Sequence, residues 1–226
     1  MKKTLSRALS IFICLTAICY TLVFTACNPK PDYISYVSEL RKDIFTGEQD
    51  NFSVVIYSGT KESPAVFDGI KNQTALTLTF KVTCKEEVGE SIKICFETGN
   101  KKYEKTLDFN PVKSTLCCDV EVNSLPEKEL AVTLCYGESS TVVNTLSRLK
   151  ENTISYTKAL ESAAEKASDF LSEHTEGGTL KAEIVLRLLC ENDRNYYYVG
   201  FVCEEGLKRA YLVNGENGEI IAEKTN

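Results

Sequence analysis

Hydrophobic and polar residues alternate along most of the stretch between residues 51 and 143. The clearest example is TALTLTFKVTC at 74–84, in which leucine, phenylalanine and valine occupy every second position and threonine and lysine occupy the others. This period of two is typical of a strand with one buried face and one face in water. Because half-buried sheets must pair their apolar faces, the pattern predicts an antiparallel β-sandwich. Further strand-like runs are FSVVIYS at 52–58, SIKICFE at 91–97, TLCCDVEV at 115–122 and ELAVTLCY at 129–136.

The hydrophobic spacing becomes helical after residue 155. One apolar stripe runs along SYTKALESAAEKASDFLSEHTEGG, with Ser155 suited to cap the first turn and Gly177 and Gly178 suited to end the helix. Four strand-like runs follow, and together they predict a helix packed on a four-stranded antiparallel meander. The runs are LKAEIVLRLLC at 180–190, NYYYVGFVC at 195–203, KRAYLVN at 208–214 and EIIAEK at 219–224.

The loop between the last two runs, NGENG at 214–218, has the polar and glycine content of several kinds of site. A calcium loop needs more carboxylates at regular spacing, and a phosphate loop needs a following helix. Neither feature is present, whereas asparagine and glycine tolerate the positive φ of a tight hairpin. The sequence therefore predicts a turn here.

The segment at 27–50 is predicted to be a tether followed by a short helix. Two prolines in NPKPD, at 28–32, exclude regular structure there. Apolar residues then recur at helical spacing, with Asp32 available as a cap and Gly47 as a stop. These apolar positions are Tyr33, Tyr36, Leu40 and Ile44.

The amino terminus has the charged-then-apolar order of a secretory signal. Lys2, Lys3 and Arg7 precede an apolar run that ends in LVFTAC, and NPKPD follows directly. A small residue before a cysteine, with a polar segment after it, resembles the lipobox of bacterial lipoproteins, although Phe24 stands where that family favours leucine. The resemblance implies a signal peptide at 1–26 and lipidation of Cys27, with the protein anchored at the extracytoplasmic face of the cell membrane. An uncleaved helical anchor is the alternative, and it also places the rest of the chain outside the cytoplasm.

The last 70 or so residues resemble the PepSY domain family. The similarity lies in the alanine-rich helix KALESAAEKA, the strand YYYVGFV and the ending AYLVNGENGEIIAE, with Asn217 where the family has threonine. The resemblance implies a secreted or membrane-anchored, non-catalytic module, and members of the family have been proposed to inhibit or regulate peptidases.

These observations predict an α+β fold class. An immunoglobulin-like antiparallel β-sandwich at 51–146 is followed by a PepSY-like α+β domain at 147–226. The signal peptide at 1–26 and the tether and short helix at 27–50 precede them.

Charge excludes one class of partner. The chain has a net charge of −6, and removal of residues 1–26 takes away three positive charges and no negative ones, which leaves −9. A strongly acidic surface repels phosphate backbones, so we do not expect nucleic acid as a partner.

The residues needed for catalysis are sparse. The one histidine, His174, lies at the predicted end of the long helix, where a cation interacts favourably with the helix carbonyls. No C-x-x-C spacing occurs, so metal and redox sites are weakly supported. We therefore predict no catalytic residues, no metal and no cofactor.

Seven cysteines remain after the signal and the proposed lipid site, and an odd number cannot all pair internally. By strand alternation, Cys84 and Cys118 point inward as small apolar side chains. Cys95, Cys117 and Cys135 point to the other face. If their strands are neighbours, two of these could form a cross-strand disulfide, or all three could line a second apolar surface. The remaining two are Cys190 and Cys203.

Three consecutive tyrosines, Tyr196, Tyr197 and Tyr198, place aromatic rings on both faces of one predicted strand. Exposed aromatic rings on an acidic surface are candidates for a recognition patch. Ordinary strand filling is the alternative interpretation.

Together these features predict a cell-surface lipoprotein that acts as a non-catalytic binding or regulatory module. Its expected partners are the membrane, through the lipid anchor, and another envelope protein or a peptidase. A cysteine-dependent redox or enzymatic protein and a structural spacer in an envelope assembly are the alternatives.

Overall fold

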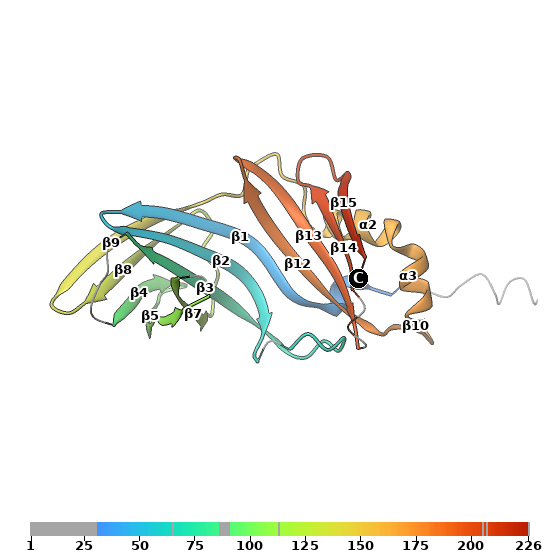
Figure 1. Cartoon of the computed structure of the whole chain (residues 1–226), viewed down its shortest axis with the longest axis horizontal. Helices are drawn as coiled ribbons and strands as arrows, with labels where there is room; N and C mark the ends of the chain where they lie inside the picture. The colour runs from blue at the N-terminus through green and yellow to red at the C-terminus, as the bar shows by residue number, and fades with distance from the viewer. Residues whose placement is uncertain are drawn as a thin grey trace, which may run out of the picture.

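The protein is mostly β, with strands in 60% and helices in 11% of the structure. The computed structural model describes residues 31–64, 66–85, 91–112, 114–204, 206 and 208–225, so the proposed signal peptide and Cys27 lie outside the described residues. Thirteen strands belong to one sheet that crosses the whole molecule, with the helices at one end of it (Figure 1). None of the helices in the described ranges has the length and apolar character needed to cross a membrane.

A 3-10 turn, η1 (Tyr33–Tyr36), opens the described chain and the first nine strands follow it. They are β1 (Val37–Gln49), β2 (Phe52–Glu62), β3 (Thr74–Cys84), β4 (Ile92–Thr98), β5 (Lys101–Thr106), β6 (Asp108–Asn110), β7 (Thr115–Glu121), β8 (Glu129–Tyr136) and β9 (Ser139–Ser147).

Two helices separate these strands from the last six. The elements are α2 (Tyr156–Lys166), α3 (Ser168–Glu173), β10 (Thr175–Glu176), β11 (Thr179–Leu180), β12 (Ala182–Glu191), β13 (Arg194–Cys203), β14 (Lys208–Asn214) and β15 (Ile220–Thr225).

Strand β1 joins the two halves of the sheet. One of its edges pairs with β2 along almost its entire length. The other edge pairs first with β12, in parallel, and then with β9, in antiparallel orientation. The main path of the sheet is β15-β14-β13-β12-β1-β2-β3-β7-β6, and β4, β5, β8 and β9 continue it from the second edge of β1.

The short helix predicted over Tyr33 to Gly47 is wrong beyond its first turn, because Val37–Gln49 is strand β1. Two register shifts interrupt this strand, one between Val37 and Glu39 and one between Arg41 and Asp43. Each shift adds an unpaired residue. The added residues destroy the period of two that identifies a strand, so the apolar positions mimic helical spacing.

The predicted α+β fold class is also wrong. The chain does not consist of an immunoglobulin-like sandwich followed by a self-contained helix on a four-stranded meander. The strands β12 to β15 pair in chain order, but β12 continues through its parallel pairing with β1 into the same sheet as β2 and β3. Because the spacing from Tyr33 to Gly47 predicts a helix, it conceals β1, the strand that joins the two halves.

Two hydrophobic clusters form the core, and β1 contributes to both. Val37 and Ile44 belong to the cluster beneath the helices, whereas Phe45 belongs to the cluster between β2, β3 and β7 on one side and β4, β8 and β9 on the other. The alternating runs of the sequence supply the second cluster, as expected. The structure thus has two cores but one continuous sheet.

The helical segment begins where the sequence predicts. Ser155 caps α2 by accepting a hydrogen bond from the backbone N–H of Lys158 at 3.2 Å. Helix α2 ends at Lys166, and α3 begins at Ser168 and ends at Glu173 with His174 as its C-cap, so the single predicted helix is two shorter ones. His174 Nδ1 lies 2.8 Å from the carbonyl oxygen of Phe170, and its ring packs on that of Phe170. This contact fits a structural role for the histidine.

The connection between β2 and β3 folds back onto the sheet. Two buried carboxylates hold it, because Glu62 accepts a hydrogen bond from the backbone N–H of Asn72 and Glu183 accepts one from that of Gly69. The loop carries Phe67 and Ile70, which remain exposed.

Candidate functional site

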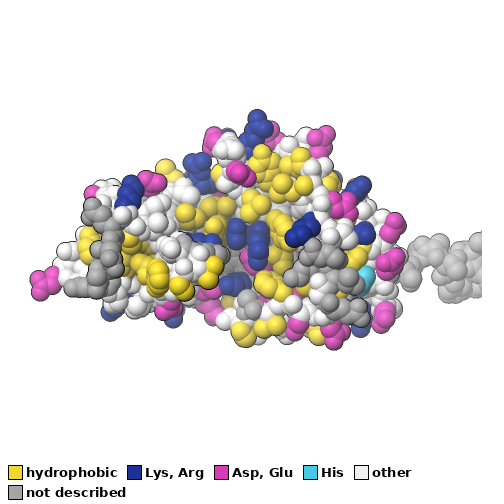
Figure 2. Space-filling model, viewed as in Figure 1, with side chains coloured by type: hydrophobic (Ala, Val, Ile, Leu, Met, Phe, Trp, Pro, Cys, Tyr) yellow, Lys and Arg dark blue, Asp and Glu magenta, His cyan; other side chains and the backbone are white. Residues whose placement is uncertain are grey.

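A cleft of about 670 Å³ lies between the strands β1 and β2 and the tip of the β12–β13 hairpin. The pairing of β12 with β1 ends at Arg187 opposite Arg41, and β9 occupies the same edge of β1 from Phe45 onward. The hairpin tip at 191–194 therefore leaves the sheet surface and the cleft opens beneath it. Figure 2 shows lysine and arginine side chains gathered in a hollow at the centre of this face, over β1 and β2. We call this site the arginine cleft.

Arg41 and Tyr57 form the centre of the arginine cleft. The guanidinium carbon of Arg41 lies 3.7 Å from the centroid of the Tyr57 ring, which is a cation-π contact. Lys81 approaches the same ring, with its Nζ 3.4 Å from the Tyr57 hydroxyl oxygen. Arg41 faces Gly59 in β2, where a Cβ would lie only 1.7 Å from the Leu40 carbonyl oxygen. Glycine at this position therefore allows the close strand approach that fixes Arg41.

Two arginines share one carboxylate beside this centre. Glu39 accepts hydrogen bonds from both Nε and Nη2 of Arg187, the first at 2.7 Å. Its nearest approach to Arg41 is longer, at 4.0 Å between Oε1 and Nη2, and the buried Nε of Arg41 has no hydrogen-bond partner. The carboxylate thus neutralises Arg187 and leaves Arg41 only partly compensated.

The two guanidinium groups differ accordingly in their pKa values. Burial lowers the pKa of Arg41, and the charge of Arg187 adds to this effect, against the opposing influence of Tyr57 and Glu39. Burial also acts to lower the pKa of Arg187, but the hydrogen bonds and charge of Glu39 outweigh it and raise the value. The charged form of Arg41 is therefore the less well stabilised of the two.

The rim of the cleft is held by Asn195, which is buried. Its Oδ1 accepts hydrogen bonds from the backbone N–H of Lys150 at 2.9 Å and from the Thr153 hydroxyl at 2.8 Å, and its Nδ2 donates to the carbonyl of Arg148 at 3.0 Å. Asp193 then pairs with the side chains of both Arg148 and Lys150. These bonds position two further cationic side chains at the mouth.

The balance of charge in the cleft is opposite to that of the chain. The chain has a net charge of −6, but among the described residues more cations than carboxylates lie in or beside the cleft. The cations are Arg41, Lys81, Arg148, Lys150 and Arg187, and the carboxylates are Glu39, Glu191 and Asp193. The apolar residues Val55, Ile44 and Leu189 also line it. The arrangement can pair an anionic group with the guanidinium of Arg41, which is stacked on an aromatic ring beside an apolar surface.

The three tyrosines predicted as a binding patch divide between the two faces of β13. Tyr197 is buried under the helices and donates a hydrogen bond to the carbonyl of Ile154 at 2.9 Å. Tyr196 and Tyr198 are half-buried on the opposite face. Tyr198 is the cross-strand neighbour of Arg187, and Tyr196 that of Leu189, so these two adjoin the arginine cleft.

The cysteines follow the predicted alternation in part. Cys118 is buried in the second core and Cys84 packs against it, as expected. Cys95 and Cys135 lie together on neighbouring strands, with 4.0 Å between their sulfurs. Cys117 lies on β7 opposite Lys81, away from the β4–β8 pair, so the alternative in which all three outward cysteines line one surface does not hold.

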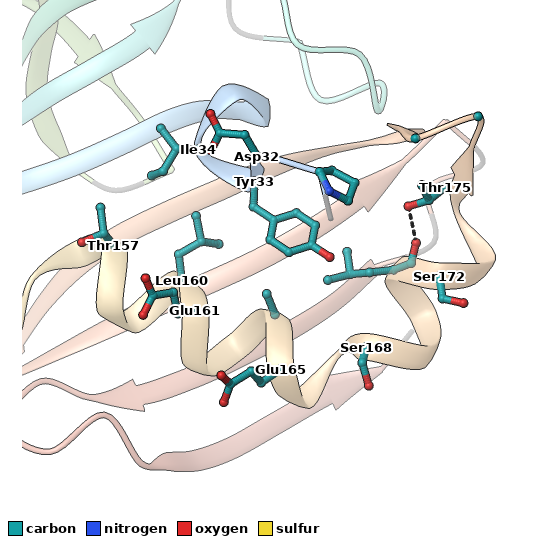
Figure 3. Close-up of a pocket in the computed structure, with 15 residues that line it drawn as sticks. Asp32, Tyr33, Ile34, Thr157, Leu160, Glu161, Glu165, Ser168, Ser172 and Thr175 are labelled. Atoms are coloured by element: carbon teal, nitrogen blue, oxygen red, sulfur yellow. Dashed lines mark hydrogen bonds between the residues drawn. The ribbon is translucent and has the colours of Figure 1, made fainter. Parts of the chain in front are cut away.

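A second cavity, of about 770 Å³, lies between η1 and the helices (Figure 3). The ring of Tyr33 points from η1 toward α2 and α3, and Glu161 and Glu165 lie along α2. This groove has an apolar floor and an acidic rim, and among the residues that the structure describes no lysine or arginine lines it. The polar side chains that line it are hydroxyls and carboxylates, whereas the arginine cleft holds the partly compensated charge of Arg41, and we therefore place the candidate site in that cleft.

Sequence reasoning missed Arg41, Tyr57, Lys81 and Arg148. Arg41 lies in the segment whose spacing predicts a helix. In the strand that forms instead, Arg41 and Glu39 are two residues apart and therefore share one face. The other three come from distant strands whose pairing the sequence does not state. Among the described residues, no three His, Cys, Asp or Glu side chains are grouped so that they could hold a metal ion.

Comparison with known proteins adds no relative, because no protein-family profile, curated protein or solved structure matches the chain.

Proposed function

We propose that this protein is a lipid-anchored, non-catalytic binding module at the outer face of the cytoplasmic membrane, and that it binds an acidic segment of another envelope protein in the arginine cleft. The observation that carries the proposal is Arg41, a partly compensated and largely buried cation, 16% exposed, that is stacked on Tyr57 and whose buried Nε has no hydrogen-bond partner. A buried charge without full compensation is costly to a folded protein. An anionic ligand that pairs with Arg41 would remove this cost.

The geometry favours a carboxylate-bearing peptide. The planar guanidinium fork matches a carboxylate in two parallel hydrogen bonds. Beside it, Val55 and Leu189 offer an apolar surface that a peptide side chain can cover. A volume of about 670 Å³ accommodates a short segment of chain rather than a folded domain.

The net negative charge of the chain does not oppose such binding at short range. In physiological salt the Debye length is about 8 Å, so remote exposed carboxylates are largely screened. Charges that are partly buried in the cleft are screened much less. Local attraction therefore dominates once the ligand has reached the cleft.

Membrane attachment rests on the lipobox-like LVFTAC and on Cys27 as the lipidated residue. The test is incorporation of labelled palmitate in cells, which we expect in the natural protein and not in Cys27→Ser. Equal labelling of both, or equal membrane retention of an unlabelled Cys27→Ser, would reject the anchor. In a narrower form of this proposal, the envelope protein that is bound is a peptidase and the binding regulates it. This form rests only on the similarity of the carboxy-terminal segment to PepSY domains.

Photo-crosslinking in intact membranes tests the binding site. A benzoylphenylalanine in place of Leu149, which follows the lining residue Arg148 in the chain and is 40% exposed, reports on the mouth of the cleft. Val142 on β9, at 51% exposure, is the matched control position. We expect an adduct from Leu149 that is absent from Val142 and is lost when Arg41→Met is added.

The sequence of the crosslinked peptide decides the chemistry. An acidic peptide supports the proposal. An adduct that persists in Arg41→Met, or one with a peptide that contains no carboxylate side chains, contradicts it.

A further inference from the structure

Cys95 and Cys135 form a close pair on the outward face of the β4–β8 ladder. Cys95 lies opposite Thr133 and Cys135 lies opposite Lys93, so the two cysteines are diagonal neighbours on adjacent antiparallel strands. Their sulfur atoms are 4.0 Å apart. A disulfide needs an S–S distance of about 2.05 Å, so the two sulfurs must move about 2 Å closer together before they bond.

Both thiols are accessible enough to react. Each is half-buried, whereas Cys118 on the inward face is buried in the second core and its pKa is raised to about 12. The inward neighbours Ile94 and Leu134 are fully buried and fix the two strands from below. The pair therefore lies on a rigid ladder with its sulfurs toward the outside.

We propose that Cys95 and Cys135 are a reversible oxidation site, at which a disulfide oxidant converts the two thiols into a cross-strand disulfide. One thiolate attacks the oxidant, forms a mixed disulfide and releases one thiol of the oxidant. The other thiolate then attacks the protein-side sulfur, which forms the Cys95–Cys135 bond and releases the second thiol. Two electrons pass to the oxidant, and the two protons of the protein thiols are taken up by the thiolates that leave it.

The surroundings of the pair make this reaction slow at neutral pH. Burial raises the pKa of Cys95, and the hydrogen bond and charge of Cys135 raise it further. The ammonium group of Lys93 opposes this, but it is itself paired with Glu104 at 3.0 Å. Oxidation is therefore expected to accelerate as the pH rises, because the thiolate is the attacking form.

The proposed bond is independent of ligand binding. It joins β4 to β8, whereas the arginine cleft is built from β1, β2 and the β12–β13 hairpin. Failure of one proposal therefore leaves the other untouched.

Peptide mapping of the purified full-length chain tests the site. The folded protein is treated with oxidised glutathione, alkylated and digested with trypsin, which places Cys95 in the peptide 94–101 and Cys135 in the peptide 129–148, each as the sole cysteine. We expect these two peptides to be linked in the folded protein and to be released by dithiothreitol. Cys117→Ser, which changes another half-buried outward thiol, should leave the link intact.

The variants Cys95→Ser and Cys135→Ser identify the reacting atoms. In either one, the remaining cysteine should carry glutathione instead of a protein link, and circular dichroism should show an unchanged fold. Recovery of both peptides singly alkylated or singly glutathionylated from the natural protein would overturn the proposal. So would links from these two cysteines to other cysteines in equal yield, as expected of the unfolded chain.

Discussion

Replacement of Arg41 by methionine should leave the stability of the protein nearly unchanged, although the side chain is largely buried. The perturbation removes a cation-π contact with Tyr57, which contributes about 0.5–2 kcal/mol. It also removes an interaction with Glu39 at 4.0 Å, which contributes less than about 1 kcal/mol. Against these losses, methionine relieves the desolvation of a charge whose exposed fraction is 16% and the repulsion from Arg187. We expect a net change within about 1 kcal/mol.

Replacement of Glu39 by glutamine is the control for this prediction, because it should lower the stability much more than Arg41→Met does. Loss of one partner of a fully buried pair costs about 3–5 kcal/mol, because the other charge remains uncompensated. Glu39 is 15% exposed, but its main partner Arg187 is 33% exposed and is partly screened by water. The expected loss of stability for Glu39→Gln is therefore about 2–3 kcal/mol.

Urea unfolding measures both variants. The chain contains no tryptophan, so far-ultraviolet circular dichroism is the suitable probe. Free energies of unfolding are compared at equal slope of the linear extrapolation. If Arg41→Met loses as much stability as Glu39→Gln, then Arg41 is a structural partner of Glu39. The claim that the charge of Arg41 is left available for a ligand is then refuted.

Three further substitutions test separate parts of the structure. Burial raises the pKa of Asp43, in spite of its hydrogen bonds from Ser147 and from the backbone of Ile44. The contribution of this carboxyl group to stability is therefore greatest below its pKa in the unfolded chain and is lost as the pH rises through its pKa in the folded protein. Measured by urea unfolding from pH 4 upward, the stability of the natural protein relative to Asp43→Asn should fall as the pH increases, and a rise would show that the sign is wrong. Tyr197→Phe removes the buried hydrogen bond to the carbonyl of Ile154 and should lower the free energy of unfolding by about 1 kcal/mol. Burial raises the pKa of Tyr197 to about 12, so a spectrophotometric titration of this variant should lack one tyrosine that ionises near that pH. Gly59→Ala places a Cβ 1.7 Å from a backbone oxygen of Leu40 and should lower the free energy of unfolding by more than about 3 kcal/mol; a normal melting temperature for this variant would contradict the close approach of β1 and β2.

Strand alternation was sufficient to predict the parts of the fold that local pattern controls. The inward faces of β2, β3, β4 and β8 follow directly from the period of two, and all of them supply the second core. The turn at 214–218 is confirmed, because Gly218 adopts a φ of +79° and the backbone N–H of Asn214 donates to Glu219 across it. These features depend only on residues close together in the chain.

The joined sheet and the cleft could not be predicted in this way. Strand β1 carries two register shifts, and its apolar residues Leu40 and Ile44 continue the helical spacing that begins at Tyr36. Its edge is shared between β12 and β9, which lie about 145 and about 100 residues further along the chain, and no local pattern reveals that pairing. Because the cleft opens where β12 departs from β1, it was hidden together with the strand that creates it.

Binding of an acidic peptide to the purified protein tests the central claim most directly. A peptide of alternating glutamate and leucine, labelled with a neutral fluorophore, is titrated by fluorescence anisotropy against the natural protein, Arg41→Met and the exposed control Lys102→Met. A charge-assisted hydrogen bond contributes about 1.5–3 kcal/mol, so we expect Arg41→Met to bind at least about tenfold more weakly while Lys102→Met binds like the natural protein. Equal affinity of all three proteins, or equal binding of the corresponding lysine and leucine peptide, would contradict the account.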